Sequence, residues 1–475
     1  MNSAFIKAIQ ELLGKSSSSD RSKTQGKFSS EVDGGLRPLS PYDLLGSGFS
    51  KNDDLAKDVK QGAETPGFKR FLNHELKATL GDPSGKRLKI AVFHRNFDPS
   101  AGGAENYAVS LVEQLCALHE IHVYAQRIKH DCQGVTYHRV PQLFARPRWL
   151  NQLIYASYCA WMTRAKLGFD IIHSHENTWS GNVQTVHVVP LTHNLFAGKT
   201  LSQNILQWVK VILSPRLLSY VILEKLRLAN KKGRWFIAVS KPLNKLLEYS
   251  MACDPNAIMT IPPGIHIQKW EGQSARALKR MNARELLALP ENAKCLLWIG
   301  HDAQKKGLDV ALRALALLPS DYVLIVVGAA RPKVFWESLV KNTISGRVLE
   351  KGAVDSKALQ ALYEACDILI HPTKEDTFGM VVLEAMAHGL PVIVSNAQHC
   401  GISSELVDNE TALILSNPDD PVELAGKVVL GLQGQLKDVL STKGQNWANM
   451  HDWARIAELQ NTVYSYIVST GVKKL

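Results

Sequence analysis

Residues 371–391 have the sequence HPTKEDTFGMVVLEAMAHGLP, and the local structure that they encode decides the fold. The apolar run 368–370 just before them is typical of a buried strand, whereas the apolar residues after Gly379 recur at helical spacing. Gly389 and Pro391 are expected to end that helix, and the next strand is expected to follow at once. The loop of this strand–loop–helix–strand unit lies at the carboxyl end of a strand, where open α/β sheets bind ligands.

Two acidic residues, Glu375 and Asp376, lie in this loop, and Glu384 follows inside the helix. The free N–H groups and the positive dipole end of a helix N-terminus favour a phosphate, whereas carboxylates accept hydrogen bonds from hydroxyl groups. A nucleotide sugar carries both kinds of group, so the pattern predicts a nucleotide-sugar site. The alternative is a solvated loop followed by an ordinary capped helix.

The stretch resembles the acidic E-x7-E signature of the retaining glycosyltransferases of family 4, in the form Asp376-x7-Glu384. The resemblance implies that the first acid contacts the transferred sugar and that Glu384 holds the ribose hydroxyls of the nucleotide. Because an aspartate replaces the family's first glutamate and Glu375 precedes it, either residue could contact the sugar. The further donor contacts expected at the start of the helix are Phe378, Gly379 and Met380.

The length of 475 residues exceeds what one hydrophobic core supports, so two domains plus additional sequence are expected. The additional sequence is residues 1–85, whose middle part has the composition of a disordered segment. A short apolar helical face at its start would touch a membrane or partner, or would be a marginal helix without a binding role.

The composition predicts a cytoplasmic protein. No run of 18 or more uncharged apolar residues indicates a membrane-spanning helix, and the start of the chain lacks a secretory pattern. The seven cysteines are scattered without a Cys-x-x-Cys pair, which favours reduced thiols over a disulfide or zinc framework.

The positive charge is concentrated in one part of the chain. Residues 86–265 contain 21 Lys and Arg against 10 Asp and Glu, whereas residues 276–475 contain 21 against 22. Such an excess attracts an acidic partner, such as nucleic acid, anionic lipid or a phosphorylated glycolipid. Nucleic acid is not expected, because the sequence has no basic and aromatic stacking platform and no recognised nucleic-acid-binding motif.

The first folded domain is expected to open with a strand at 87–94, followed by a loop that contains Gly102 and Gly103 and then by an amphipathic helix. Adjacent glycines at a strand-to-helix turn let a ligand approach the backbone closely. The family resemblance implies that this pair lies against the donor phosphates and the reaction centre. A plain turn would show the same two glycines.

Three histidines lie near expected strand ends: His173, His175 and His187. His173 and His175 alternate along one strand and could share a metal ion, but Glu176, the acid close to them, would point to the opposite face. The resemblance implies that no metal is needed and that His187 points toward the donor sugar. We expect His187 in the catalytic site and a structural or acceptor-side role for His173 and His175.

Residues 195–234 are unusually apolar and include Trp208, and Pro215 is expected to begin the second helix of this segment. The basic residues toward its end are Lys225, Arg227, Lys231, Lys232 and Arg234. An apolar face with tryptophan and basic residues is typical of a helix at a membrane surface, although helix packing inside the domain would give a similar pattern. A peripheral contact with the inner face of the cell membrane is therefore one of two expectations for this segment.

In the second domain an expected strand ends at Gly300, and Lys305 and Lys306 follow it just before an expected helix. A lysine in that position can reach a diphosphate as a point charge. The resemblance implies that Lys306 neutralises the donor phosphates. His301 stands where the family often has an arginine, so Lys305 is expected to supply the second charge; two solvated lysines in a turn are the alternative.

Strands and helices alternate through most of the chain, which predicts parallel, doubly wound sheets. The resemblance implies an α/β fold of the GT-B type, with two Rossmann-like domains facing a cleft and the nucleotide base near Val354. The expected organisation is an extension at 1–85, an acceptor-binding domain at 86–268, a nucleotide-sugar-binding domain at 269–455, and a C-terminal helix at 456–475 that crosses back to the first domain.

Within the family, several turns resemble the glucosyltransferases of lipopolysaccharide core, including the segment Arg331-Pro332-Lys333. The resemblance therefore implies metal-independent transfer of a hexose, with retention, from a nucleotide sugar such as UDP-glucose to an anionic glycolipid or saccharide. The donor is a substrate, so no separate cofactor is expected. The alternatives are a nucleotide-sugar epimerase of the same architecture and a membrane-associated scaffold that has lost catalysis.

Overall fold

The computed structural model describes residues 87–144, 146–164, 168–267, 273–289, 292–328, 344 and 346–470. The expectations for residues 1–85 and for Arg331-Pro332-Lys333 lie outside this part of the chain.

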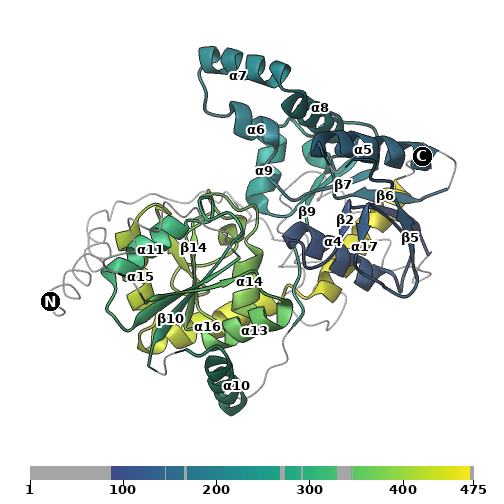
Figure 1. Ribbon diagram of the computed structural model, residues 1–475. Helices are drawn as coiled ribbons and strands as arrows, with labels where there is room; N and C mark the ends of the chain where they lie inside the picture. The colour runs from purple at the N-terminus through teal and green to yellow at the C-terminus, as the bar shows by residue number, and fades with distance from the viewer. Residues whose placement is uncertain are drawn as a thin grey trace, which may run out of the picture. The chain divides into compact units, whose positions relative to one another are not determined.

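The first sheet has seven parallel strands in the order β5-β3-β1-β6-β7-β8-β9 (Figure 1). These strands are β1 (Lys89–Phe93), β3 (Glu120–Ala125), β5 (Val135–Arg139), β6 (Ile171–Ser174), β7 (Val183–Val186), β8 (Trp235–Ala238) and β9 (Ile258–Thr260). The chain winds outward from β1 to β5 and then in the other direction from β6 to β9. The topological switch point, where a doubly wound sheet binds ligands, therefore lies between β1 and β6.

Six helices of regular α type and one short two-stranded sheet complete this region within the described residues. The helices are α4 (Gly103–Leu115), α5 (Arg148–Arg164), α6 (Leu191–Phe196), α7 (Leu201–Leu213), α8 (Pro215–Leu228) and α9 (Lys241–Tyr249). The small sheet pairs β2 (Asn96–Phe97) with β4 (Arg127–Ile128). It joins the loops that leave β1 and β3, both at the carboxyl edge of the large sheet.

The second sheet has six parallel strands in the order β12-β11-β10-β13-β14-β15, with the switch point between β10 and β13. The strands are β10 (Lys294–Ile299), β11 (Tyr322–Val327), β12 (Val348–Gly352), β13 (Ile368–His371), β14 (Val392–Ser395) and β15 (Leu413–Leu415). The helices in this region are α10 (Gln273–Leu286), α11 (Leu308–Leu317), α13 (Ser356–Ala365), α14 (Met380–Ala387), α15 (Pro421–Gly431) and α16 (Gly434–Asn449).

Both faces of the second sheet are covered by helices, because its strands are apolar on both sides (Figure 1). Along β10, Cys295 and Leu297 join one hydrophobic cluster with residues of α13 and α14. Leu296 and Trp298 point the other way and join a second cluster with residues of α11 and α15. Two parallel, doubly wound α/β sheets confirm the expected fold class.

The last helix, α17 (Trp453–Ser469), packs on α4 of the first region. The Trp453 ring meets the Tyr107 ring edge-to-face at 5.4 Å between centroids. The Tyr464 hydroxyl lies 2.6 Å from Nδ1 of His173 on β6. The end of the chain therefore supplies part of the core of its first folded region.

Helices α6, α7 and α8 form a projecting group whose members are anchored very differently (Figure 1). On α8, Glu224 accepts hydrogen bonds from the Leu191 and Thr192 backbone N–H groups and so caps α6. On α7, Val211 is the one buried residue among those described. Among the described residues no single helix could cross a bilayer, although α7 and α8 together meet the length and composition criteria and are bent by 105°.

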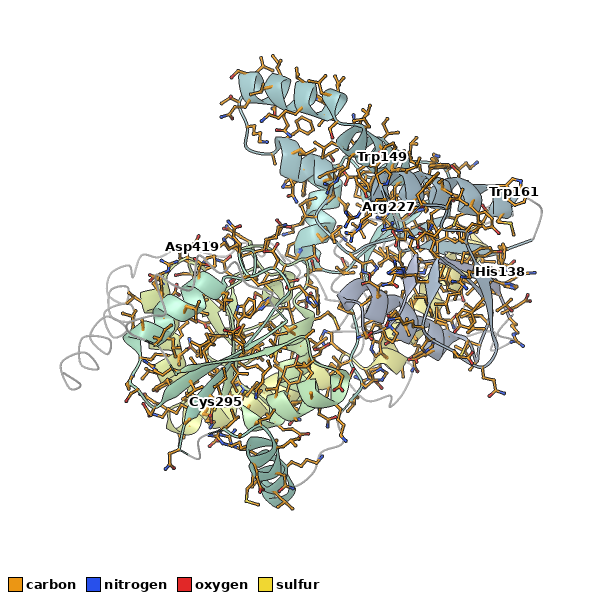
Figure 2. All side chains as sticks on the ribbon, viewed as in Figure 1. His138, Trp149, Trp161, Arg227, Cys295 and Asp419 are labelled. Atoms are coloured by element: carbon orange, nitrogen blue, oxygen red, sulfur yellow. The ribbon has the colours of Figure 1, made fainter. Side chains whose placement is uncertain are left out.

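The structure corrects the interpretation of two basic residues in this segment. Arg227 and Arg234 are buried, and Arg227 donates to Gln184 Oε1 at 3.2 Å, to Asn177 Oδ1 at 2.8 Å and to the Thr185 carbonyl. Figure 2 shows Arg227 among the side chains of this region. These two arginines hold α8 against the sheet, because a buried guanidinium needs several acceptors, and they are not part of a basic surface.

Candidate functional site

Two loops leave the carboxyl ends of β10 and β13, on either side of the switch point of the second sheet. Their backbones are joined, since the Lys374 N–H donates to the Lys305 carbonyl at 2.7 Å. Gly307 has a φ of +68°, and a Cβ placed on it would lie 1.9 Å from the Pro372 carbonyl oxygen. Only glycine permits this approach, which brings the lysine loop onto the acidic loop.

The lysines and acids predicted from the sequence meet as two ion pairs. Lys306 Nζ lies 2.6 Å from Asp376 Oδ2 and also donates to the Glu375 carbonyl at 3.2 Å. Lys305 Nζ lies 3.0 Å from Glu375 Oε1. The Asp376 side chain is 18% exposed and that of Glu375 is 39% exposed, so the inner pair is the more shielded of the two.

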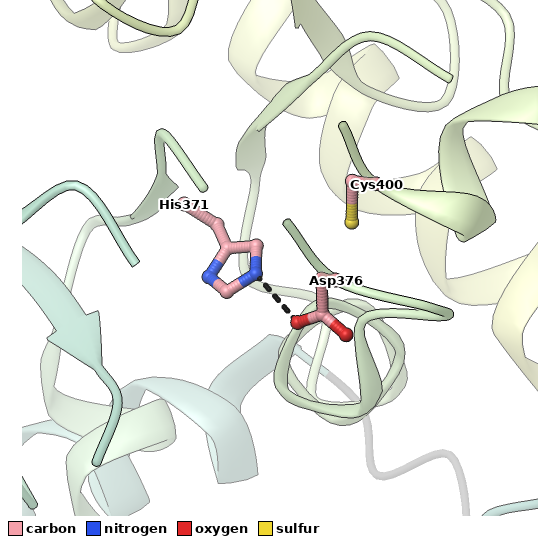
Figure 3. A group of neighbouring side chains, drawn as sticks. All are labelled: His371, Asp376 and Cys400. Carbon is pink, nitrogen blue, oxygen red and sulfur yellow. Dashed lines mark hydrogen bonds and ion pairs between the residues drawn. The ribbon is translucent and has the colours of Figure 1, made fainter. Parts of the chain in front are cut away.

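Asp376 is held by three donors. Besides Lys306, His371 Nε2 lies 3.1 Å from Oδ2 (Figure 3). The Phe378 backbone nitrogen donates to Oδ1 at 3.3 Å. Burial alone would raise the pKa of Asp376, but the hydrogen bond with His371 and the positive charge of Lys306 hold it below 3.8. Burial also lowers the pKa of His371 from 6.5, so a neutral His371 donates from Nε2 to the carboxylate.

Cys400 lies beside this pair, and ligating atoms of His371, Asp376 and Cys400 are within 4.8 Å of one another (Figure 3). Burial raises the pKa of the Cys400 thiol well above 9, which disfavours the thiolate that a metal ion needs. The Lys306 ammonium already neutralises Asp376. The residues present therefore fit an ammonium-neutralised carboxylate better than a metal site.

Three helices begin at glycines in this region, and none has a side-chain cap among the described residues. They are α4 with Gly102 at its N-cap, α11 with Gly307 and α14 with Gly379. A Cβ on Gly103 would lie 3.4 Å from Met380 Cγ, so the starts of α4 and α14 are adjacent. A helix N-terminus favours an anion through its unpaired N–H groups and positive dipole end. The start of α14 is the better candidate of the two, because Glu105 already places a carboxylate in the first turn of α4.

Glu384 lies on α14, and its Oε2 accepts a hydrogen bond from the Tyr363 hydroxyl of α13 at 2.8 Å. Burial raises the pKa of Glu384, an effect that the Tyr363 hydrogen bond opposes. Helix α13, which precedes α14 in the chain, therefore orients the Glu384 carboxylate.

His187 follows β7 and contacts the acidic loop through its backbone, because Thr377 Oγ1 donates to the His187 carbonyl at 2.5 Å. Its ring contacts Tyr107 edge-to-face, and its Nε2 lies 2.9 Å from Nδ1 of His175. Burial lowers the pKa of His187 well below 6.5, so the ring is neutral near pH 7. Among the described residues, the hydrogen bond of the His187 ring is made by Nε2. Nδ1 is therefore the ring nitrogen that could bind a ligand.

His173 has a different environment from His187. Nδ1 bonds with Tyr464 and Nε2 bonds with Thr185 Oγ1, each at 2.6 Å. Both ring nitrogens are thus engaged in the core, as expected of a structural residue. β6 ends at Ser174, so the strand is shorter than predicted and Glu176 turns back to bond with Arg95.

The remaining predicted residues lie at the same edge of the second sheet. Gly300 directly follows β10, and its N–H donates to the Val327 carbonyl at 3.0 Å. Val354 follows β12 and is half-buried against the core. The Phe378 side chain is buried, so its ring packs in the core while its backbone lines the loop.

His371 and Tyr363 were not predicted as site residues from the sequence. His371 directly follows the apolar run 368–370 that was predicted as a strand, and a titratable residue at the carboxyl end of a strand is a candidate by position. Tyr363 belongs to a separate helix, and no spacing rule relates it to Glu384.

Two doubly wound domains, with lysines and acids at the switch point of the second, define a glycosyltransferase of the GT-B class. Family models agree: one described as "Glycosyl transferases group 1" matches residues 279–447, and one described as "Glycosyltransferase Family 4" matches residues 101–269. The folded part of the chain thus belongs to the group 1/family 4 glycosyltransferases.

Two curated relatives are informative. The lipopolysaccharide glucosyltransferase WaaG of Escherichia coli K12 is 28% identical over 212 residues, which cover 43% of this chain and 55% of WaaG. The chain thus aligns with little more than half of that enzyme. An uncharacterized glycosyltransferase of Methanocaldococcus jannaschii, MJ1607, is 25% identical over 405 residues, which cover 79% of this chain and 98% of that protein.

Solved structures share the fold at low identity. A crystal structure of WaaG, described as a glycosyltransferase involved in lipopolysaccharide biosynthesis, has a TM-score of 0.67 at 20% identity and covers 79% of this chain and 99% of that chain. The Anabaena protein Alr3699/HepE in complex with UDP-glucose has a TM-score of 0.59 at 17% identity and covers 80% of this chain and 100% of that chain.

Proposed function

We propose that this glycosyltransferase moves a hexose from a nucleotide sugar to a cell-envelope glycolipid or polysaccharide, with retention of anomeric configuration. The observation that carries the proposal is the contact of Lys306 with Asp376 at the switch point of the second sheet, beside the uncapped start of α14. A nucleotide sugar carries a diphosphate and several hydroxyl groups. The lysine offers positive charge to the diphosphate, and the carboxylates accept hydrogen bonds from the hydroxyl groups.

Each residue has a role in this mechanism. Lys306, with Lys305, stabilises the negative charge that develops on the departing diphosphate, and the N–H groups at the start of α14 add to that field. Asp376 orients the hydroxyls of the transferred sugar, and Glu384 holds the ribose. His187, neutral at pH 7, supports the sugar through Nδ1 as positive charge develops on it.

Asp376 is the better candidate of the two loop acids for the sugar contact. Its carboxylate is fixed by His371 and the Phe378 N–H, whereas Glu375 is more exposed and has Lys305 as its partner. A fixed carboxylate loses less conformational entropy when it binds a hydroxyl group. When a diphosphate takes up the positive charge of Lys306, Oδ2 of Asp376 becomes available to the sugar.

The donor is proposed to be UDP-glucose and the acceptor lipopolysaccharide core. HepE, which shares the fold, was solved with UDP-glucose, and the related WaaG of E. coli is a lipopolysaccharide glucosyltransferase. The lysines and helix N-termini supply the charge that a metal ion would otherwise supply, so the proposed reaction is metal-independent. The donor is a substrate, and no separate cofactor is required.

We also propose a cytoplasmic enzyme that is peripheral at the inner face of the membrane, through α7. The apolar side chains exposed on this helix are Leu201, Ile205, Leu206, Trp208, Val209, Ile212 and Leu213. Lys225 Nζ lies 5.0 Å from the centre of the Trp208 ring, which places a cation beside this apolar surface. A glycolipid acceptor would be presented at such a surface.

The decisive experiment is a hydrolysis and transfer screen over UDP- and GDP-sugars with lipopolysaccharide core as acceptor. Lys306→Ala and Glu384→Ala are each expected to lower transfer at least a hundredfold while the protein remains folded, because each removes a charge contact to the donor. Lys294→Ala is the control, since Lys294 lies at the opposite end of β10 and pairs with Asp321.

Three outcomes would contradict the proposal. Undiminished transfer by both variants would remove the site assignment. A changed nucleotide sugar without any acceptor would indicate an epimerase. Nucleotide binding without turnover of any donor would indicate a scaffold.

A further inference from the structure

The loops at the carboxyl edge of the first sheet enclose a cavity of about 370 Å³. It lies at the first switch point, because Arg95 follows β1 and Glu176 follows β6. A second cavity of about 560 Å³ shares Arg127 with the first and adds Arg139. The two cavities also share Gln126 and Gln142, so they form one continuous hollow surface.

This surface has an unbalanced positive charge. Arg95 is neutralised, since its Nε lies 3.3 Å from Glu176 Oε2. The other arginines on the surface are Arg127, Arg139, Arg146 and Arg148. Within the part of the chain that the structure describes, none of these four pairs with a carboxylate, and Glu105 is the one further acid that lines the cavities.

All four arginine side chains are exposed, so water weakens their mutual repulsion, but an oxyanion bound among them would neutralise charge that no carboxylate of the described residues neutralises. Their planar donors match the oxygens of a phosphate or carboxylate in pairs, which a lysine cannot do. Solvated surface arginines would give the same charge without the concave shape. The surface is concave, positively charged and located at a switch point, and these three properties together indicate a ligand-binding site.

The cavity is linked to the donor site through α4. Glu105 lies in the first turn of this helix, two residues after Gly103, whose neighbour is Met380 at the start of α14. We propose that the arginine surface binds a phosphate or carboxylate group of the acceptor saccharide, near the N-terminus of α4. This inference rests on the proposed function and adds the acceptor's chemical class and the residues that recognise it.

The test measures binding by calorimetry of core oligosaccharide from lipopolysaccharide, before and after removal of phosphate with hydrofluoric acid. The double variant Arg127→Gln/Arg148→Gln is expected to bind the oligosaccharide about tenfold to a hundredfold more weakly, because each arginine loses hydrogen bonds to a charged group. Hydrolysis of the donor without acceptor is expected to stay at the wild-type rate. Lys232→Gln/Lys245→Gln is the matched control, since it removes two exposed charges from the same region outside both cavities.

The two sources of the oxyanion give different results. Loss of arginine-dependent binding after dephosphorylation identifies phosphate, and its persistence identifies carboxylate. Equal affinity of the arginine variant and the control overturns the inference, as does failure of the wild-type protein to bind either form. Arginine-dependent binding without turnover of any donor would refute the proposed function and leave the anion site in place.

Discussion

At the scale of single residues, the Asp376 carboxylate is partly shielded from water and nevertheless charged. His371 and the Phe378 N–H donate to it, and Lys306 supplies the opposite charge. A carboxylate with these partners keeps its charge where burial would otherwise neutralise it. The protein itself therefore orders the proposed donor site, and a donor would need only to displace one partner of Lys306.

Tyr363 is expected to act as a positioning residue for Glu384. In Tyr363→Phe the carboxylate loses a hydrogen bond, its pKa rises further, and its orientation is no longer fixed. We expect the KM for the donor to rise about tenfold while kcat changes little, since a hydrogen bond to a charged group contributes about 1.5–3 kcal/mol.

The control is a donor whose ribose lacks the 2′ and 3′ hydroxyls. Wild-type protein and Tyr363→Phe should use this donor equally poorly, because the contact that Tyr363 supports is then missing in both. A variant that loses kcat with every donor, or loses thermal stability, would indicate a purely structural tyrosine.

At the scale of elements, α7 and α8 show how one apolar sequence segment divides into one helix that is largely exposed and one that is anchored in the fold. Arg227 and Glu224 fix α8 to the sheet and to α6. α7 follows a capping box at Thr200 and exposes most of its apolar side chains. A helix of 13 residues is too short to cross a bilayer. Its exposed apolar face is typical of a helix that lies in the membrane–water interface.

The double variant Ile205→Ser/Ile212→Ser is expected to weaken vesicle binding about tenfold or more. Each isoleucine is more than half exposed and would transfer its apolar surface into lipid. The measurement is co-sedimentation with vesicles of phosphatidylglycerol and phosphatidylcholine. Leu286→Ser on α10 is the matched control, because Leu286 is exposed to a similar degree on another helix. Equal sedimentation of both variants would contradict a membrane role of α7.

At the scale of the whole molecule, histidines buried in the core link folding to pH. Burial lowers the pKa of His173 and of His451 to about 3. The unfolded chain binds a proton at each position near pH 6.5, whereas the folded chain does not. Stability is therefore complete above about pH 6.5 and falls as the pH decreases from there toward 3.

We expect the free energy of unfolding to decrease between pH 6.5 and 5.5 by about 1 kcal/mol for each such histidine, because the unfolded histidine is already half protonated at pH 6.5. Urea unfolding at pH 7.5, 6.5 and 5.5 measures the change. His173→Gln should be less stable than the wild type at pH 7.5, because Tyr464 and Thr185 lose their partner, but should lose less stability per pH unit. Equal pH dependence in the two proteins would show that His173 is not the group that titrates.

Much of the fold could be predicted because its strands and helices carry strong periodic patterns. β10, β11, β13 and β14 are continuous apolar runs, as buried parallel strands are, and the helices after them repeat at helical spacing. β5 was not predicted, because its residues are polar or half-exposed at the edge of the sheet. β15, with three residues, is too short to show a pattern.

The sequence by itself determined which residues form the candidate donor site, because lysines before one helix and acids before another are local features of a strand–loop–helix unit. Only the tertiary structure decided which residues orient them, such as Tyr363, and that four arginines from three separate segments of the chain share one hollow surface. The physical reason is that the switch point of a parallel sheet joins strands far apart in the chain, so contacts across it have no fixed spacing in the sequence.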